Sequence, residues 1–461
     1  MPQNNDPRPS SSFADRPRAV QPTPPQSTHR RPRFWRRVRR GLAGALLLSV
    51  AAFCVANVVT SWLLHRELTA VVQRGEPLRI GALVPPSLPA LQNAAPVYLR
   101  AAAALTLTRS EEEELRSTKA TGSHAELLAK NQTAIQLTRQ AAEFPTCRFP
   151  VDYDATNMAG ILLPHLGKMQ RLADVIRAQA EWEAQQGQTD AALNDVAVLF
   201  RMSEHLAPEP LLISGVITMA IERKGYTALA HVLNEVSLSP EQAHVCALRL
   251  SHIEWTATLR QDLRGERCFG LWAFRYISNP VQASQLLNGP SAPSFDPGMK
   301  VLSVLWSPFW KMDEIQYLRA IDRRSEEFQY PGTPLISDDA FTNELPRYAI
   351  CSRVMLPALP PVARKRDQLL VYRRMALVAL ALHAYRTSQG RYPPDLNTAE
   401  SAWGAALPRD LSTDQPFLYK TDGETMSLSS VGSHPKELED KKEKRTRADD
   451  GSADSADDLA W

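Results

Sequence analysis

The stretch GLAGALLLSVAAFCVANVVTSWLL, at residues 41–64, decides how the rest of the chain is organised. None of its 24 residues is charged, and only Ser49, Asn57, Thr60 and Ser61 are strongly polar. A helix of this length spans about 36 Å at about 1.5 Å per residue, which is enough to cross a hydrocarbon core of about 30 Å with some tilt. We therefore predict a transmembrane helix over residues 41–64.

Arginines on one side of this segment predict its orientation. Seven of them precede it closely, namely Arg30, Arg31, Arg33, Arg36, Arg37, Arg39 and Arg40. On the other side only Arg66 and Arg74 are near. Cytoplasmic flanks of membrane helices carry an excess of Lys and Arg, so we expect residues 1–40 in the cytoplasm and the rest of the chain outside it. Residues 1–32 contain eight prolines and almost nothing apolar, so we predict that residues 1–40 form a disordered basic tail in the cytoplasm.

The same arginines account for the basic charge of the chain. Residues 1–40 contain ten Arg against Asp6 and Asp15, a net charge of +8, whereas the whole chain carries +3, so the remaining residues carry −5. A mildly acidic remainder without a basic stripe argues against nucleic acid as a partner. The partner that the arginines fit is the lipid bilayer with its anionic headgroups.

Two alternatives remain open for the apolar segment. Cys54-Val55-Ala56 is a small-x-small triplet, so cleavage as a signal peptide competes with an uncleaved anchor. Because the apolar run continues past this triplet to Leu64, we expect the anchor. A stripe of small residues would also let two copies of the helix approach closely as a homodimer, although an alanine-rich anchor without a partner has the same stripe. The stripe consists of Gly41, Ala45, Ser49, Ala52 and Ala56.

Helical spacing of apolar residues dominates the chain after the anchor. We expect a stalk and a proline-rich linker at residues 65–92, with Gly75-Glu76-Pro77 ending the stalk helix, and an array of helices at 93–356. Ser239-Pro240-Glu241-Gln242 has the pattern of a helix start with an N-cap and a capping box. Helices are predicted at residues 94–107, 157–186, from Thr189 onward, 211–232, from Ser239 to about Leu263, and at 313–329, with loops at 279–298 and 331–346.

No catalytic or nucleotide-binding motif stands out in the sequence. It lacks HExxH, a GxSxG elbow, a Walker loop and GxGxxG. Ser433-His434-Pro435-Lys436 matches SxxK, but it lies in a charged stretch without the buried lysine that base catalysis needs. Five histidines fall on predicted helices, where we expect them to be hydrogen-bonded or exposed, namely His165, His205, His231, His244 and His252.

Four cysteines follow the anchor, at Cys147, Cys246, Cys268 and Cys351. Their wide spacing excludes a CxxC zinc or redox motif. An even number in an oxidising compartment allows one or two disulfides, and burial as structural thiols explains them as well.

The last part of the chain, residues 357–461, is predicted to form a small α+β module. A helix at 362–389 is followed by two short strands, Phe417-Leu418-Tyr419 and Met426-Ser427-Leu428, which flank the turn Asp422-Gly423. The predicted fold class is therefore mainly α, with a transmembrane helix, a helical array outside the membrane, and this module with its β-hairpin.

Four runs in this module carry a family resemblance. They are LALHAYR at 380–386, GRYPPDL at 390–396, PFLY at 416–419 and LSSVG at 428–432. They resemble the C-terminal module shared by the major pseudopilins of type II secretion and a group of uncharacterised bacterial single-pass membrane-anchored proteins. CRFP at 147–150 is similar to a segment of the latter group. The resemblance implies a protein of the bacterial inner membrane and brings no biochemical activity with it.

The resemblance also implies a candidate metal site. In pseudopilins the loop after the segment that resembles LSSVG holds calcium through backbone oxygens and aspartates, which are ligands that suit a hard cation. Asp449, Asp450 and Asp457 are the candidates for calcium here, although an acidic tail explains them as well. No other cofactor is implied.

These observations favour a non-enzymatic interaction or scaffold protein that is tethered to the membrane and has protein partners in the cell envelope. The alternative is an envelope hydrolase whose residues meet only in three dimensions, around the aromatic residues Trp306, Phe309 and Trp310. A third interpretation is a calcium-binding module linked to secretion.

Overall fold

The computed structural model of the chain describes residues 32–116, 124–153, 163–279, 282, 297–333 and 338–430. These residues are mainly helical, and two antiparallel strands lie near the C-terminal end, which confirms the predicted fold class. The chain divides into two compact units, one ending at Ala56 and the other beginning at Asn57.

The helices range from 6 to 42 residues in length. In chain order they are α1 (Pro32–Gln73), α2 (Ala95–Ala103), α3 (Arg109–Arg116), α4 (His124–Lys130), α5 (Gln132–Ala142), α6 (Pro164–Gln185), α7 (Thr189–Leu206), α8 (Leu212–Glu235), α9 (Pro240–Leu248), α10 (Trp255–Ser278), α12 (Pro297–Glu327), α13 (Asp338–Glu344), α14 (Ile350–Met355), α15 (Leu359–Gln389) and α16 (Leu396–Trp403). Short 3-10 turns occur at η1 (Ile80–Ala82), η2 (Ala90–Gln92) and η4 (Leu356–Ala358). The strands are β1 (Leu418–Thr421) and β2 (Met426–Ser429).

The described part of the first unit is the beginning of α1. This helix is long and apolar enough to span a membrane, and large apolar side chains such as Leu47 and Leu48 are exposed along it. It begins at Pro32, so residues 32–40, which the sequence assigns to a disordered tail, are helical. Proline suits the first turn of a helix and arginine is a good helix former, so the arginine-rich stretch extends α1 instead of ending it.

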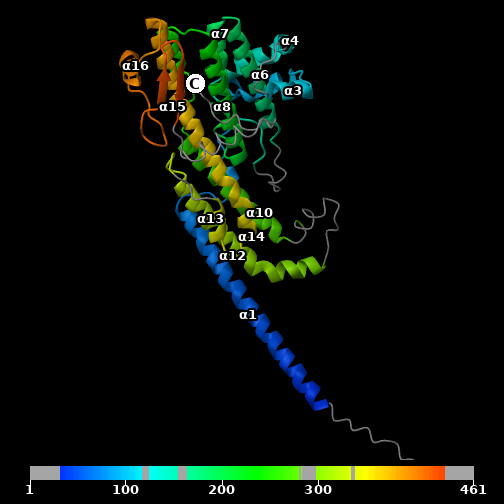
Figure 1. Cartoon of the computed structure of the whole chain (residues 1–461). Helices are drawn as coiled ribbons and strands as arrows, with labels where there is room; N and C mark the ends of the chain where they lie inside the picture. The colour runs from blue at the N-terminus through cyan, green and yellow to red at the C-terminus, as the bar shows by residue number, and fades with distance from the viewer. Residues whose placement is uncertain are drawn as a thin grey trace, which may run out of the picture. The chain divides into compact units, whose positions relative to one another are not determined.

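The core of the second unit is formed by α6, α7 and α8, which lie side by side (Figure 1). The turn between α6 and α7 contains Gly187, whose φ of 71° favours glycine. Alanines let these helices approach closely, since Ala178 and Ala180 on α6 and Ala192 on α7 are buried. Helices α2 and α5 pack against each other and against this group.

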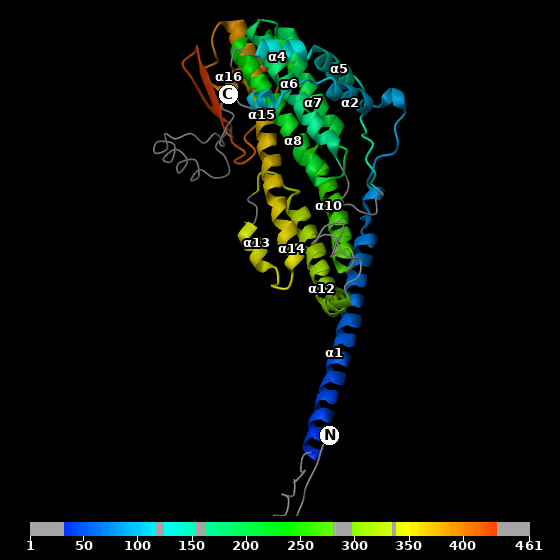
Figure 2. The same ribbon diagram turned by 90° about the vertical axis from the view of Figure 1, so that its right-hand side faces the viewer.

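The long helix of the C-terminal part is α15, which packs against α8 and α9 (Figure 2). It ends as predicted, because Gly390 follows it with a φ of 76° and makes the left-handed residue that commonly terminates helices. Helix α16 packs against α15 as well. The predicted C-terminal module therefore shares a compact unit with the helical array.

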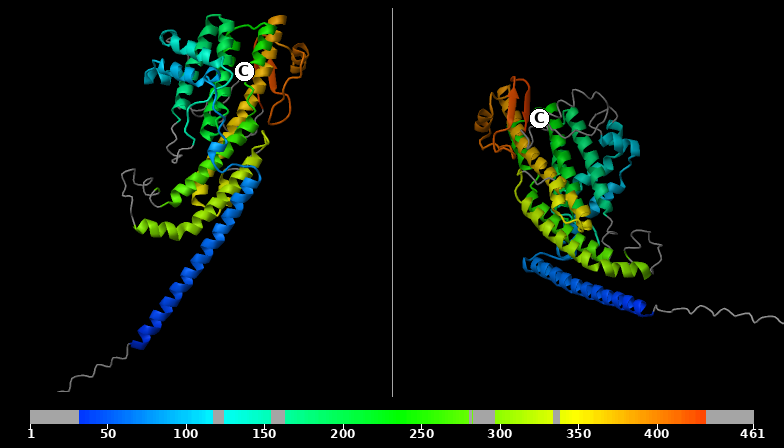
Figure 3. Two further views of the ribbon diagram at one scale, coloured as in Figure 1. Left: turned by 180° about the vertical axis from the view of Figure 1, so that it is seen from behind. Right: turned by 60° about the horizontal axis from the view of Figure 1, so that its bottom comes forward.

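The β-hairpin lies beside α15, against which β2 packs (Figure 3). Its register pairs Leu418 with Ser429 and Thr421 with Met426, so that residues 422–425 form the turn. This arrangement confirms the two predicted strands and the turn that starts at Asp422-Gly423.

The predicted start of α9 is confirmed in detail. The backbone N–H of Gln242 donates to the Ser239 hydroxyl over 3.2 Å, and the backbone N–H of Ser239 donates to the Gln242 side chain over 3.0 Å. The two residues thus satisfy each other's free donors at the helix end, with Pro240 in the first turn.

The predicted end of the same helix is wrong. Helix α9 stops at Leu248 instead of continuing to about Leu263, and α10 starts at Trp255. In the break, the carbonyl oxygen of Ile253 accepts hydrogen bonds of 3.1 Å from both terminal nitrogens of Arg373. A continuous helix would use that carbonyl internally, so a contact with α15 replaces the helical bond.

Helix α12 also differs from the prediction. The sequence predicts a helix from Asp313, whereas α12 already begins at Pro297 and contains Pro308. A proline inside a helix removes a backbone donor, so a sequence pattern favours a boundary there. In addition, α13 (Asp338–Glu344) lies within the predicted loop at 331–346.

Candidate functional site

Residues 57–74 run beside residues 307–322 of α12 and are joined to them by polar side chains. We call these side chains the stalk ladder. Its pairs are Asn57–Ser307, Asn57–Lys311, Ser61–Lys311, Glu67–Arg319 and Arg74–Asp322. The two members of every pair are separated by 248 to 254 positions, so the helices run parallel and keep one register along the contact.

The ladder pairs of Asn57 and Ser61 explain why two polar residues occur within the predicted membrane span. The Asn57 side-chain oxygen accepts hydrogen bonds from the Ser307 hydroxyl over 2.9 Å and from the Lys311 ammonium over 3.0 Å. Lys311 also donates to the Ser61 hydroxyl over 2.9 Å. Because an unpaired polar group costs free energy in an apolar environment, these bonds favour a fixed contact between α1 and α12.

Just after Arg74, the last stalk residue of the ladder, Glu76 accepts hydrogen bonds from two arginines of α10. Arg264 Nε lies 2.7 Å from Glu76 Oε2, and Arg267 Nη1 lies 2.8 Å from the same oxygen. Arg267 Nη2 is also 2.6 Å from Asp322 Oδ1. Burial acts to raise the pKa of Glu76, but the hydrogen bonds and charges of Arg264 and Arg267 outweigh it and hold that pKa below its usual value. The ionised form of Glu76 is therefore favoured, and its carboxylate pairs with both arginines.

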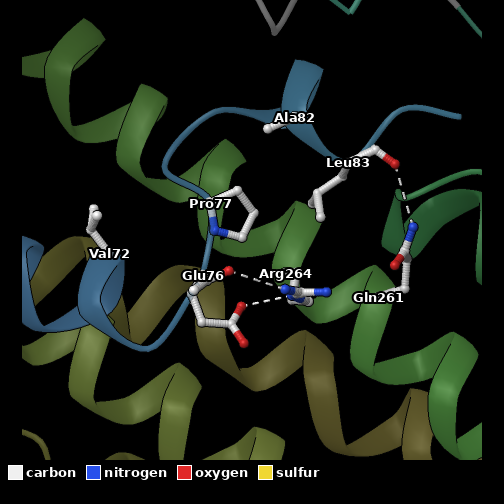
Figure 4. Close-up of a pocket in the computed structure, with 8 residues that line it drawn as sticks. Val72, Glu76, Pro77, Ala82, Leu83, Gln261 and Arg264 are labelled. Carbon is white, nitrogen blue, oxygen red and sulfur yellow. Dashed lines mark hydrogen bonds and ion pairs between the residues drawn. The ribbon is translucent and has the colours of Figure 1, made fainter. Parts of the chain in front are cut away.

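A pocket of about 510 Å³ opens beside Glu76 (Figure 4). Its polar side chains already have partners, because Arg264 pairs with Glu76 and the Gln261 amide donates to the Leu83 carbonyl over 3.4 Å. The lining contains one carboxylate and no histidine, cysteine or hydroxyl, so it lacks an acid–base pair. The lining residues are Val72, Gly75, Glu76, Pro77, Ala82, Leu83, Gln261 and Arg264.

A buried polar cluster lies where α6 and α8 meet. His165 Nε2 is 2.8 Å from Glu209 Oε1, and the Ser214 hydroxyl donates to Glu209 Oε2 over 2.7 Å. Phe149 stacks on the imidazole of His165 with ring centroids 4.3 Å apart. These three polar side chains are all buried.

The order of these contacts is not that of a catalytic triad. In a triad the histidine accepts the hydroxyl proton, whereas Ser214 donates to the carboxylate of Glu209 and not to His165. The hydroxyl is also completely buried, so a substrate carbonyl cannot reach it. The cluster instead links the α7–α8 connection, through Glu209, to His165 on α6 and Ser214 on α8.

Asp262 on α10 is an acid that is buried between packed helices. It is fully buried, and neither of its carboxyl oxygens has a hydrogen-bond partner among them. A Cβ atom at Gly215 would lie 2.1 Å from Asp262 Oδ2, so α8 and α10 touch at this point. Burial raises the pKa of Asp262 well above its usual value, and the nearby Glu209 and Glu266 add to the effect. Burial therefore favours the protonated, uncharged form of this carboxyl.

A second buried network centres on Glu222 of α8. Its carboxylate accepts the Trp255 indole N–H over 2.7 Å and the Tyr226 hydroxyl over 2.9 Å, and it pairs with Arg373 Nη2 over 3.0 Å. Burial acts to raise the pKa of Glu222, and it outweighs the opposing charge of Arg373. The network connects α8, α10 and α15.

The predicted calcium ligands Asp449, Asp450 and Asp457 lie outside the described residues, as does the segment Ser433-His434-Pro435-Lys436. Within the ranges that the structure covers, no three His, Cys, Asp or Glu side chains are placed to hold a metal ion. The calcium site therefore stays a prediction.

The five histidines on predicted helices are hydrogen-bonded or exposed, as expected. His205 Nδ1 lies 2.9 Å from the Tyr98 hydroxyl, and its Nε2–H donates to the Phe144 carbonyl over 3.0 Å. Burial, assisted by the charge of Arg201, lowers the pKa of His205 to about 4. His231, His244 and His252 are exposed.

The cysteines are all free thiols. Of the two alternatives that the sequence leaves open, the structure has structural thiols and not disulfides. Cys246 and Cys268 are buried, and burial raises the pKa of the first to about 12 and of the second to about 11. Such thiols are poor nucleophiles at neutral pH.

Comparison with known proteins yields no relative, because no protein-family model, curated protein or solved structure matches the chain. The resemblance to the pseudopilin module is thus an expectation that rests on the sequence alone.

Sequence reasoning did not single out Glu209, Glu222 or Asp262. Each is a single acid in or beside a helix, where a charge is ordinarily solvated, and only contact between distant helices buries it. Glu209 alone carries a local signal, since it stands between Pro208 and Pro210 in a tight connection.

Proposed function

We propose that the chain is a membrane-tethered interaction or scaffold protein of the bacterial inner membrane, with its N-terminal tail in the cytoplasm and its helical unit outside. The observation that carries the proposal is the stalk ladder. Asn57 and Ser61 belong to the apolar run, yet they are hydrogen-bonded within the folded unit. A domain that is merely retained at a membrane needs no contact between its anchor helix and its folded unit. A domain that presents a binding surface at a set distance from the membrane benefits from such a contact.

The buried polar groups support this role over that of a hydrolase. The His165–Glu209–Ser214 cluster and the Glu222–Arg373 network are enclosed between packed helices and join elements that are distant in sequence. Groups used in this way stabilise a defined shape, which is what a binding surface requires.

The topology is tested with fusions to the full chain. Alkaline phosphatase is active only outside the cytoplasm and green fluorescent protein folds poorly there, so we expect a C-terminal phosphatase fusion to be active and a C-terminal fluorescent fusion to be dark. The protein should stay with the membrane after carbonate extraction. A fluorescent C-terminal fusion would reverse the orientation, and release by carbonate would remove the anchor.

The scaffold role is tested by proximity labelling from the C-terminus in native membranes. We expect a reproducible set of envelope proteins that is reduced when the ladder is weakened by Lys311→Ala with Arg319→Ala. Arg323→Ala is the matched control, because it removes an arginine of the same helix whose pair with Glu344 is exposed. A labelled set that equals the one from an unrelated anchored protein would refute the proposal.

A further inference from the structure

The first turns of α12 expose an apolar helix face. Its members Val301, Val304, Leu305, Trp306 and Phe309 are each between 44% and 61% exposed. Positions 301, 304, 305 and 309 recur at intervals of three and four residues, so they line one side of the helix. From residue 301 to residue 310 the sequence has no charge. Contiguous exposed apolar surface of this kind marks a contact with a partner or a membrane.

The stalk ladder places this face at a definite level along α1. Ser307 lies between Trp306 and Phe309 in sequence, and it is hydrogen-bonded to Asn57. Asn57 precedes the end of the apolar run at Leu64 by seven residues, which corresponds to about 10 Å along a helix. The face is therefore level with residues inside the predicted membrane span. Helices that lie in a membrane interface bury their apolar side to a depth of about 5–10 Å, which agrees with this position.

The direction of the helix also suits a position in the membrane plane. Pro308 lies inside α12, and the N-terminal part of this helix runs in a different direction from the rest of it (Figure 1). The bend has a physical cause, because a proline interrupts the backbone hydrogen bonds of the preceding turn. Trp306 and Phe309 have ring centroids 5.4 Å apart. Tryptophan favours the headgroup level of a bilayer, and phenylalanine is common on the apolar face of helices that lie in the membrane interface.

We infer that residues 301–309 of α12 insert into the outer leaflet as a helix that lies in the membrane plane, so that the chain contacts the bilayer at a second place without crossing it again. The inference rests on the proposed anchoring by α1. Lipid is the occupant of the face because the residue that sets its level, Asn57, belongs to the apolar run itself. Lys311 is hydrogen-bonded to Asn57 and Ser61. It is the first charged residue after the apolar face, where α12 continues into the folded unit.

Photo-crosslinking in the full-length chain tests this inference. The protein is reconstituted in vesicles of phosphatidylethanolamine and phosphatidylglycerol, with benzoylphenylalanine in place of Phe309 and, separately, of Val304. The same probe at Leu48 reports on the span, and at Leu418 on a surface of the folded unit that is 52% exposed. Lipid adducts are counted by mass spectrometry. We expect Phe309 and Val304 to give several-fold more lipid adduct than Leu418 and a yield close to that of Leu48.

The outcomes separate this inference from the anchoring. Adducts at Leu48 with only the Leu418 background at both Phe309 and Val304 would overturn the in-plane helix and leave the anchor intact. Crosslinks from Phe309 to a second protein chain in place of lipid would overturn it as well. If Leu48 gives no lipid adduct, the anchor fails and the inference fails with it.

Discussion

Arg373 on α15 places its Nη2 atom 3.0 Å from the Oε1 atom of Glu222 on α8, although the two residues are 151 positions apart. The same guanidinium donates to the carbonyl of Ile253 in the break between α9 and α10. One side chain thus joins three helical segments around a buried carboxylate that has the Trp255 indole as a further donor. Two experiments on this pair would show how much of the fold depends on it.

We expect Arg373→Met to lower the free energy of unfolding by about 3–5 kcal/mol, because it leaves the Glu222 carboxylate buried without its cation. Adding Glu222→Gln should recover part of the loss, since the remaining group is then neutral. Urea unfolding monitored by circular dichroism measures both. The control is Arg323→Met, whose exposed pair with Glu344 contributes about 1 kcal/mol or less. Equal stability of Arg373→Met and the control would contradict the prediction.

Two helical glycines should respond in opposite ways to alanine. A Cβ at Gly265 on α10 would lie 1.8 Å from the Pro210 carbonyl oxygen, a rigid backbone atom, so Gly265→Ala should destabilise the fold by about 1–3 kcal/mol. A Cβ at Gly167 on α6 meets nothing within 4 Å, so Gly167→Ala should stabilise the fold by about 0.5–1 kcal/mol. Thermal unfolding of the two variants distinguishes them, and a shift in the same direction for both would be inconsistent with the close approach of α10 to Pro210.

Asp262 should make the protein less stable as the pH rises. Its pKa in the folded state is raised by burial, whereas an unfolded aspartic acid releases its proton near pH 4. Above that pH the folded state binds the extra proton, so stability falls by up to about 1.4 kcal/mol per pH unit for this group. Asp262→Asn should flatten this slope. Urea unfolding from about pH 5 to about pH 8 measures it, and parallel curves for the variant and the parent would disprove the assignment.

The two buried cysteines, Cys246 and Cys268, should remain reduced and slow to react in the folded protein. Because the pKa of Cys246 is about 12 and that of Cys268 about 11, only a small fraction of either is thiolate at neutral pH. We expect both to resist iodoacetamide in the native state and to react after unfolding. Thiol titration in denaturant without a reductant should give five free thiols. A deficit of two thiols would reveal a disulfide.

Local sequence was sufficient where the structure depends on neighbouring residues. The capping box of Ser239 and Gln242, the glycine after α15 and the hairpin turn at Asp422 all follow from residues within a few positions of each other. The apolar run likewise predicts a membrane helix from composition alone. Such features need no knowledge of the tertiary fold.

The sequence was insufficient to predict structure at positions where a contact with a distant residue determines the local conformation. The break after Leu248 depends on Arg373, which lies more than 100 positions away. Pro308 favours a boundary, but α12 continues through it as a bent helix (Figure 1). Asp262 and Glu222 resemble solvated acids until α8, α10 and α15 enclose them. The candidate site is therefore visible only in three dimensions, apart from the aspartates at 449, 450 and 457, which the described residues do not include.

The stalk ladder has a consequence for how the protein is made. Glu67 and Arg74 leave the ribosome early, but their partners Arg319 and Asp322 follow 252 and 248 residues later. At a synthesis rate of about 5–20 residues per second, that interval is on the order of ten seconds or longer. The stalk residues must therefore wait for these partners until α12 has been synthesised, so the stalk is among the last parts to close, and its closure reports that α12 is complete.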